Sequence, residues 1–360
     1  MTVTGTGNAP DVVDVVDVVA LGESMVTFLP SRPGRLADVP AFHRSIGGAE
    51  SNVACTLAAA GHTTRWVSRV GADGFGDHLV EAIGAYGVDV SHVRRDPARP
   101  TGVYFRTAGD RSGDTHEVAY YRAGSAASAM SPAGVDLEAV RAGRVLHLSG
   151  ITAALSRDCL ALMRELTGPR PGRPLISFDV NHRPGLWGEG QDPDVLLELA
   201  RRADIVFVGD DEARQAWGLH GARAVREALP EPEIVVVKQG KGGAVAFDKE
   251  TDGLCEDADG TATFVRAVHV DVVAAVGAGD AFAAGFLSAT LRGLPVRDRL
   301  RHGHLAAAAT LTTPGDLAPP PPRPLADRLA ALDAPAWEKL RLGPGWTTAD
   351  TEAAEEARTP

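Results

Sequence analysis

Six short apolar runs constrain the fold of this chain more than any other sequence feature. They are rich in Val, Ile and Leu and occupy residues 15–21, 65–70, 145–149, 175–180, 205–208 and 234–237. Between them lie segments of helical length, such as 76–86, 156–166, 194–202 and 211–217. Apolar strands that alternate with helices form a parallel sheet covered on both faces. The alternation therefore predicts an α/β fold whose ligands bind at the carboxyl ends of the strands.

Two segments interrupt this alternation, and the two ends of the chain differ from its body. Residues 26–44 and 101–122 do not fit it, and TGVYFRTAG and HEVAYYRAG predict a β-hairpin around residues 109–113. Residues 1–14 are expected to be a flexible tail and 15–330 the folded domain. The chain is proline-rich at 319–322, and 347–360 is polar and acidic. We therefore expect 331–360 to be a largely solvated extension without a function here.

Composition excludes several classes of protein. The 360 residues are 44% hydrophobic and 23% charged, which suits one large globular domain. A net charge of -11 argues against nucleic acid or an acidic membrane surface as a partner. Cys55, Cys159 and Cys255 form no C-x-x-C pair, so neither a disulfide framework nor a zinc site is indicated. The first residues lack a basic leader, and we expect a cytoplasmic protein.

The segment VGAGDAFAAGFL, residues 276–287, predicts a binding site for an anion. It follows the apolar run 268–273 and leads into a helical pattern that ends near Gly293. Gly277 and Gly279 allow a sharp turn, and the first N–H groups of the helix would point at a ligand. Asp280 lies in the same turn, where the helix dipole is expected to keep it ionised as a base.

A second glycine pair makes this signal specific. SIGGAESNVACTLAAAG, residues 45–61, again leads into a helix of small residues. Together the two segments resemble the paired signatures of the ribokinase-like (PfkB) carbohydrate kinases, over roughly residues 15–330. The chain has no G-x-x-x-x-G-K-[ST], and GAGDAF lacks the third glycine of G-x-G-x-x-G, so a P-loop ATPase and a Rossmann dehydrogenase are disfavoured.

The resemblance implies a fold and a reaction. It implies a ribokinase-like three-layer α/β/α sandwich with a mostly parallel central sheet, in which 26–44 and 101–122 form a small β-sheet lid. The implied reaction is ATP-dependent phosphorylation of a primary hydroxyl of a sugar. Asp280 would be the general base, and the N–H groups around Gly277, Ala278 and Gly279 would bind the transferred phosphoryl group.

The expected sugar site lies on the lid and on the strand ends below it. Tyr120 and Arg122 are two residues apart on a predicted strand and so share a face, and Tyr104 lies on the partner strand. Arg183 follows the strand 175–180. Two arginines in one pocket suit a carboxylate. YYRAGSAAS, SGITAALS and FDVNHR are most similar to 2-keto-3-deoxygluconate kinases, and by that likeness the sugar acid would contact Gly48, Asn52, Tyr104, Tyr120, Arg122, Arg183 and Asp280.

Nucleotide and metal sites are implied by weaker signals. VVVKQGKGGAVAF, residues 235–247, resembles the family's nucleotide-contacting K-x-G-x-x-G, here Lys238, Gly240 and Gly243, with Gly277 and Gly279 also near ATP. The family places N-x-x-E near Mg²⁺. This chain has Gly209 in place of the Asn and keeps Glu212, our predicted metal residue. Asp210 as a helix cap, followed by two acids in the first turn, explains this segment equally well.

Two alternatives remain open at this point. The chain could be a kinase for a neutral sugar of the fructose or ribose type, with Arg122 and Arg183 paired inside the protein. It could also be a non-catalytic binding protein on the same fold. An exposed lid sheet would be a pairing surface for a homo-oligomer.

One family feature is absent. Family members commonly read D-T-x-G-A-G-D, and in many of them the first Asp helps bind a monovalent cation. Ala274 stands at that position, followed by Ala275. A methyl group cannot bind a cation, so we expect activity that depends on Mg²⁺ and hardly on potassium.

Overall fold

The computed structural model describes residues 14–107, 117–187, 193–249 and 262–348. Within these ranges, no helix combines the length and the apolar character needed to cross a bilayer. The expected hairpin tip at 109–113, Cys255, residues 1–13 and residues 349–360 lie outside them.

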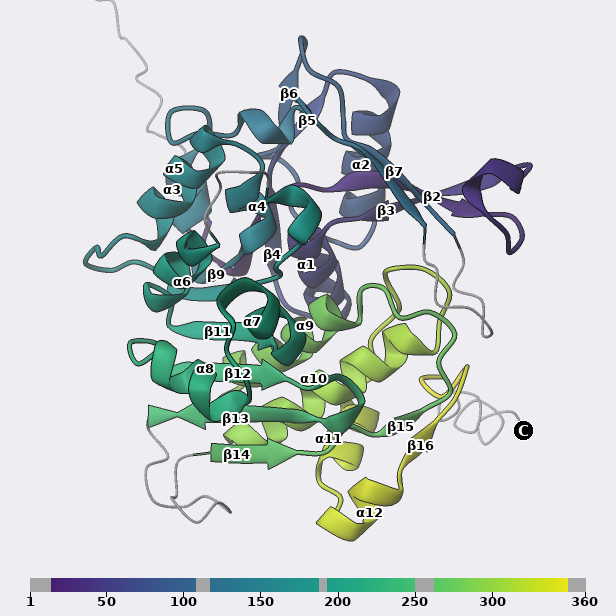
Figure 1. Ribbon diagram of the computed structural model, residues 1–360, viewed down its shortest axis with the longest axis vertical. Coiled ribbons are helices and arrows are strands. Elements are labelled where there is room, and N and C mark those ends of the chain that lie inside the picture. Colours follow the sequence, from purple (N-terminus) through teal and green to yellow (C-terminus); the bar gives the residue numbers. More distant parts are fainter. Residues whose placement is uncertain (1–13, 108–116, 188–192, 250–261, 349–360) are drawn as a thin grey trace, which may run out of the picture.

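An eight-stranded sheet forms the centre of the molecule (Figure 1). Its order is β14-β13-β12-β11-β10-β9-β1-β4; neighbours from β4 to β12 run parallel, and β13 is antiparallel to both of its neighbours. The predicted mostly parallel α/β sheet is therefore confirmed. The strands are β1 (Val16–Leu21), β4 (Thr64–Val67), β9 (Gly143–Ser149), β10 (Leu175–Asp179), β11 (Ile205–Gly209), β12 (Ile234–Lys238), β13 (Ala244–Asp248) and β14 (Ala262–Val265).

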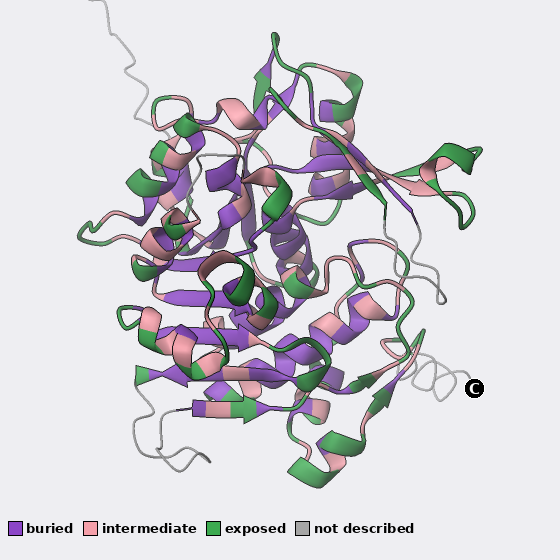
Figure 2. Ribbon diagram, in the orientation of Figure 1, coloured by how far each residue is buried: buried purple, intermediate pink, exposed green. Residues whose placement is uncertain are grey.

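Helices cover both faces of this sheet because its strands are apolar on both sides. Val206 packs in the core cluster that includes side chains of α5, α6, α7 and α8, whereas Phe207 packs with α1, α9 and α10. Figure 2 shows the buried strands between helices whose outer faces are exposed. The helices are α1 (Ala49–Ala59), α2 (Gly74–Gly84), α3 (Leu137–Arg141), α4 (Gly150–Ala154), α5 (Arg157–Thr167), α6 (Asp194–Arg201), α7 (Asp210–Trp217), α8 (Ala222–Ala228), α9 (Ala278–Leu291), α10 (Val296–Leu311), α11 (Arg323–Ala330) and α12 (Ala334–Lys339).

A second sheet projects from the main body of the molecule (Figure 1), and its strand β2 begins shortly after β1 ends. It has the order β3-β2-β7-β8 and consists of β2 (Met25–Pro30), β3 (Phe42–Gly47), β7 (Val103–Arg106) and β8 (Val118–Tyr121). We call it the lid sheet. It joins the two segments that interrupt the αβ alternation, and β7 and β8 pair as the predicted antiparallel hairpin.

Two apolar runs differ from the prediction. The run 65–70 is divided between β4 in the main sheet and β5 (Arg69–Gly71), which pairs with β6 (Arg94–Asp96). The run 268–273 forms only the short strand β15 (His269–Val270), paired with β16 (Arg341–Leu342). Val272 and Val273 are exposed. A β-branched run becomes a strand only where a partner strand is available, and β16 offers two residues.

The expectation of a solvated tail from residue 331 is wrong for its described part. Trp337 on α12 is buried in the core cluster that contains α9 and α10, and its indole Nε1 donates to the carbonyl of Arg266 at 2.9 Å. Arg301 lies 4.8 Å from the centre of its ring. The C-terminal segment up to β16 therefore belongs to the folded domain.

Candidate active site

The site is organised around the N-terminus of α9. Gly277 caps this helix with a φ of 79°, in the left-handed region that favours glycine. A Cβ at this position would overlap the carbonyl oxygen of Asp316. The N–H groups of Ala278, Gly279 and Asp280 are the first of the helix and have no partner within it. The geometry of the predicted anion-binding turn is thus present.

Asp280 lies in this turn, half-buried, and its Oδ2 accepts a 2.8 Å hydrogen bond from Nδ2 of Asn52 on α1. Loss of hydration raises the pKa of Asp280 from 3.8 to about 7, and the Asn52 bond, Lys238 and Arg183 act in the opposite direction. The expectation that the helix dipole keeps this carboxylate ionised was therefore wrong, because the cost of desolvation is larger. A carboxylate with a pKa near 7 is suited to accept a proton.

Lys238 reaches this turn from the end of β12. Its Nζ donates to both carboxylate oxygens of Asp179, at 3.1 and 2.8 Å. A Cβ built on Gly279 would lie 3.6 Å from the same Nζ. The ammonium of Lys238 therefore lies beside the anion turn, and the glycine turn that follows Lys238 in the sequence is a separate feature.

That glycine turn connects β12 to β13. Gly240 and Gly243 both have positive φ, of 55° and 132°, and the N–H of Gln239 donates to the carbonyl of Gly243 at 2.9 Å. The turn lies at the carboxyl end of β12, on the same edge of the sheet as Lys238.

Glu212 and Arg183 lie at the rim of the site. Glu212 Oε2 accepts the N–H of Gly209 at 2.8 Å and caps α7, so the cap residue is Gly209 and the predicted cap Asp210 is the first helical residue. Its Oε1 lies 3.9 Å from Nη1 of Arg183, whose side chain is 53% exposed. Desolvation raises the pKa of Glu212, with a smaller opposing effect of Lys238.

A magnesium ion held mainly by nucleotide phosphates fits these residues. Among the described residues, no group of three or more His, Cys, Asp or Glu could hold a metal alone. Mg²⁺ commonly keeps several waters and binds one or two carboxylates plus substrate phosphates. Glu212 offers one such oxygen, since Oε1 has only the distant contact with Arg183.

The sugar side is built from the lid sheet. Tyr104 and Tyr120 are opposite each other in the β7–β8 pair, with ring centres 5.4 Å apart. Arg122 follows β8, and its guanidinium carbon lies 5.8 Å from the centre of the Tyr120 ring. The predicted neighbourhood of these three residues is confirmed. Tyr120 is 53% exposed, whereas Tyr104 is buried.

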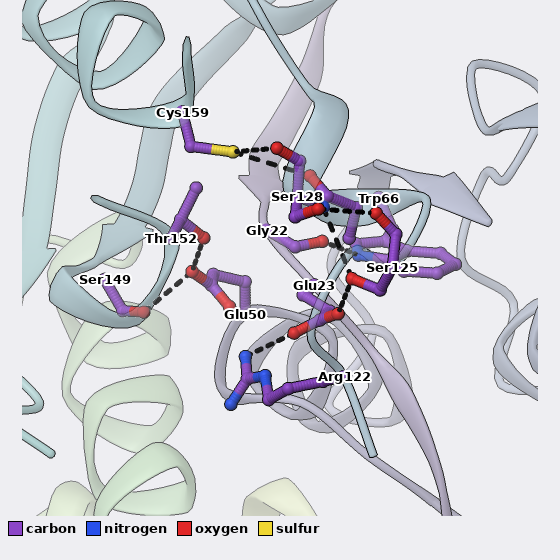
Figure 3. Close-up of polar contacts among 11 residues, drawn as sticks. Gly22, Glu23, Glu50, Trp66, Arg122, Ser125, Ser128, Ser149, Thr152 and Cys159 are labelled. Carbon is purple, nitrogen blue, oxygen red and sulfur yellow. Dashed lines mark hydrogen bonds and ion pairs between the residues drawn. The ribbon is translucent and has the colours of Figure 1, made fainter. Parts of the chain in front are cut away.

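Arg122 is paired inside the protein (Figure 3). Its Nη2 bonds to Oε2 of Glu23, and Oε1 of Glu23 accepts the hydroxyl of Ser125 at 2.6 Å. Glu23 is buried, and it directly follows β1. Glu23 therefore balances the charge of Arg122, as in the alternative of an internal pair, and contact of Arg122 with the substrate stays a prediction.

A second buried carboxyl lies beside this pair. Figure 3 shows Glu50 between Ser149 and Thr152, whose hydroxyls donate to its Oε1 at 2.7 and 2.8 Å. Glu50 is fully buried, and desolvation raises its pKa. A side chain on Gly22 would overlap its carboxyl group, so glycine is required there.

Asp316 connects the lid sheet to the anion turn. It is buried, and it accepts hydrogen bonds from the hydroxyl of Tyr104 at 2.6 Å and from Nη2 of Arg106 at 2.8 Å. Its carbonyl faces Gly277. The Tyr104 hydroxyl, predicted to contact the sugar, therefore donates to Asp316.

The structure thus gathers most of the predicted residues and adds others. Gly48 caps α1, where a Cβ would meet Glu23 and Ser24, and Asn52 is one turn further along that helix. Asp179, Glu23 and Asp316 were missed by sequence reasoning. One available signal was that Asp179 and Glu23 each lie at the carboxyl end of a predicted strand.

A carboxylate inside an anion turn, beside a lysine and near a small second sheet, defines an α/β phosphotransferase with a small-molecule acceptor. Residues 16–323 match the pfkB family carbohydrate kinase description. The chain belongs to the pfkB family of carbohydrate kinases. The protein is therefore a carbohydrate kinase, and the alternative of a non-catalytic binding protein is discarded. Sugar kinases of this class use ATP.

Known proteins resemble the chain over most of its length. It is 34% identical to a 2-dehydro-3-deoxygluconokinase of Bacillus subtilis strain 168, covering 84% of this chain and 91% of that protein. A 2-dehydro-3-deoxygluconokinase of Thermoproteus tenax is 32% identical, covering 88% and 95%. The fold is also that of an Escherichia coli putative ribokinase II solved with ATP and Mg²⁺, at a TM-score of 0.73 and 23% identity, over 87% and 98%.

Proposed function

We propose that this kinase phosphorylates a small sugar acid on its primary hydroxyl, with 2-keto-3-deoxygluconate (2-dehydro-3-deoxygluconate) as the substrate and its 6-phosphate as the product. The names of the two relatives described above support this substrate. The observation that carries the proposal is Arg183, whose side chain is 53% exposed and whose one ion pair among the described residues is a 3.9 Å contact with Glu212. Its charge also acts on Asp280.

In this proposal Asp280 is the general base. The sugar hydroxyl lies between Asp280 and the N–H groups of Gly277, Ala278 and Gly279. As the hydroxyl oxygen bonds to the γ-phosphorus, the bond from phosphorus to the bridging oxygen breaks, ADP leaves, and the proton moves to Asp280. The N–H groups stabilise the charge on the transferred phosphoryl group.

Magnesium would be held by the nucleotide phosphates, with Glu212 as a nearby carboxylate. When bound, it neutralises part of the phosphate charge. The turn around Gly240 and Gly243 would contact the nucleotide, because Gly240 and Gly242 are exposed and have no side chains to cover their backbone groups.

The Glu23–Arg122 pair favours a second candidate, a kinase for a neutral sugar. A guanidinium that is already balanced by a carboxylate has less attraction for a substrate anion. In that case the lid sheet would contact hydroxyl groups, and Arg183 would face solvent or nucleotide.

A comparison of substrates tests the proposal. ADP release is measured with 2-keto-3-deoxygluconate and with fructose, and kcat/KM is determined for each. A charge-assisted hydrogen bond contributes about 1.5–3 kcal/mol, so we expect the acid to be preferred by roughly ten- to a hundredfold. A kcat/KM for fructose equal to or above that for the acid would contradict the proposal.

Arginine variants identify the residue that binds the carboxylate of the sugar acid. Arg183→Leu should raise KM for the acid by tens of fold and leave KM for fructose and ATP nearly unchanged. Arg214→Leu, at an exposed position of α7, is the control and should change neither. Equal effects of Arg183→Leu on both sugars would remove Arg183 from substrate recognition.

A further inference from the structure

The ammonium of Lys238 lies beside the anion turn, where a Cβ built on Gly279 would be 3.6 Å from its Nζ. Its Nζ is in van der Waals range of the space beside Gly279, and 17% of its side chain is exposed. An ammonium has three N–H donors, and the two contacts with Asp179 leave at least one for another acceptor. That donor can reach the space where the turn would hold a phosphoryl group.

We propose that Lys238 is a catalytic residue whose ammonium, oriented by Asp179, stabilises the transferred phosphoryl group in the transition state. The family resemblance would instead make Lys238 a contact for the bound nucleotide. Its position against Gly279, at the helix N-terminus that contains the base, favours the phosphoryl group. The proposal rests on the chain being a sugar kinase and not on which sugar it phosphorylates.

A purely structural ion pair explains this arrangement less well. Asp179 and Lys238 lie at the end of the sheet, where their side chains are 3% and 17% exposed. A buried ion pair adds little net stability compared with apolar residues of the same volume, because both charges lose their hydration. The cost of burying the charge of Lys238 is explained if a bound ligand needs that charge.

The charges around Asp280 make the proposal measurable by pH. Asp280 is faced by Asn52 from α1, Asp179 from β10, Lys238 from β12 and Arg183 after β10. Lys238 lowers the pKa of Asp280 and Asp179 raises it. Glu212 on α7 acts on Lys238. Removing the ammonium alone must therefore raise the pKa of Asp280, whereas removing both members of the pair leaves it nearly unchanged.

Two variants separate the catalytic role from the structural one. Lys238→Met should lower kcat by about 10²–10³-fold, the effect of losing one donor to a developing anion, with little change in KM for ATP. The acid limb of its kcat/KM profile should move above about pH 7. Lys238→Met leaves the buried charge of Asp179 without its partner, which also costs stability. In the double variant Lys238→Met with Asp179→Asn, both charges are absent. Its stability and the acid limb of its pH profile should return towards those of the parent, whereas the loss in kcat should remain.

The control is Lys249→Met, which removes a lysine that pairs with Glu233 at 3.5 Å just beyond the far end of β13. It should leave kcat and the pH profile unchanged. A second readout is the affinity for ADP with aluminium fluoride and sugar, a mimic of the planar phosphoryl group, measured by calorimetry. Lys238→Met and the double variant should lose most of it and retain the affinity for ADP alone.

Either of two results would overturn the proposal. Recovery of kcat to within a few fold in the double variant would show that Lys238 serves only as the counter-ion of Asp179. A rise in KM for ATP with an unchanged kcat would make it a ground-state contact of the nucleotide. The assays use whichever sugar gives the highest kcat/KM, so failure of 2-keto-3-deoxygluconate as substrate leaves this test intact.

Discussion

Replacing Asn52 by leucine removes one hydrogen bond from the base. Nδ2 of Asn52 donates to Oδ2 of Asp280 at 2.8 Å, and the buried Oδ1 of Asn52 has no partner among the described residues. Leucine has a similar volume and no donor, so the change to side-chain bonding is confined to the loss of this one bond. Because that bond lowers the pKa of Asp280, its loss must raise it from about 7.

The size of the shift follows from the bond. A hydrogen bond to a charged group contributes about 1.5–3 kcal/mol, and one pKa unit corresponds to about 1.4 kcal/mol. We therefore expect the pKa of Asp280 to rise by about one to two units. At pH 7 the ionised fraction would fall from about half to roughly 1–10%, and kcat/KM would fall by about 5- to 50-fold. The loss should diminish as the pH rises above 7 and should be about twofold or less at pH 9.

The assay is kcat/KM from pH 5.5 to 10 for the parent and Asn52→Leu, since this ratio reports the free enzyme. Ser51→Ala is the control, because the Ser51 hydroxyl bonds to Ser24 and to the carbonyl of Gly48 and does not touch the base. Its acid limb should stay in place. If Asn52→Leu raises KM for the sugar equally at every pH, Asn52 serves the sugar alone and our account of the base is refuted.

Four further predictions concern the base, the cation and the C-terminal segment. Asp280→Asn should lower kcat by about 10²–10⁴-fold with ATP affinity nearly intact; a variant that retains most of its rate would exclude Asp280 as the base. Because the pKa of Asp280 is raised in the folded protein, this group contributes stability that is fully present below pH 3.8 and is lost as the pH rises through about 7. Asparagine does not titrate, so the variant should gain stability relative to the parent as the pH rises from 3.8 to 7, as measured by urea denaturation. Initial rates at saturating sugar and ATP should hardly respond to potassium at constant ionic strength, because the side chain of Ala274 has no ligand atom and Asp316 is bonded to Tyr104 and Arg106; a large saturable activation would disprove this. Trp337→Ala should lower the free energy of unfolding by about 3–5 kcal/mol, and an unchanged value would mean that α12 is not part of the cooperative fold.

The parallel part of the main sheet was predictable because its strands are apolar on both faces. The run 205–208 supplies side chains alternately to the two core clusters, which is possible only between two helical layers. The anion turn was equally predictable, because Gly277, Gly279 and Asp280 act through the local backbone of one helix N-terminus. Such features depend on neighbours in the sequence, and a sequence shows neighbours directly.

The features that could not be predicted depend on which strand or polar group each segment pairs with. The run 268–273 has the composition of a strand, yet β16 pairs with only two of its residues. Glu23 neutralises Arg122 across 99 positions, and Asp316 holds Tyr104 across 212. No local pattern specifies which distant group a polar side chain will meet, because any buried donor can be satisfied by any acceptor that the fold brings near.

The sequence by itself determined the alternation of strands and helices, the anion turn and the carboxylate within it. Only the tertiary structure decided the protonation of that carboxylate and the use of the charges around it. The pKa of Asp280 depends on lost hydration and on Asn52, 228 positions away, and the place of Lys238 depends on Asp179 in the next but one strand of the sheet. Electrostatic energies depend on distance and burial in three dimensions, and neither is a property of the order of residues.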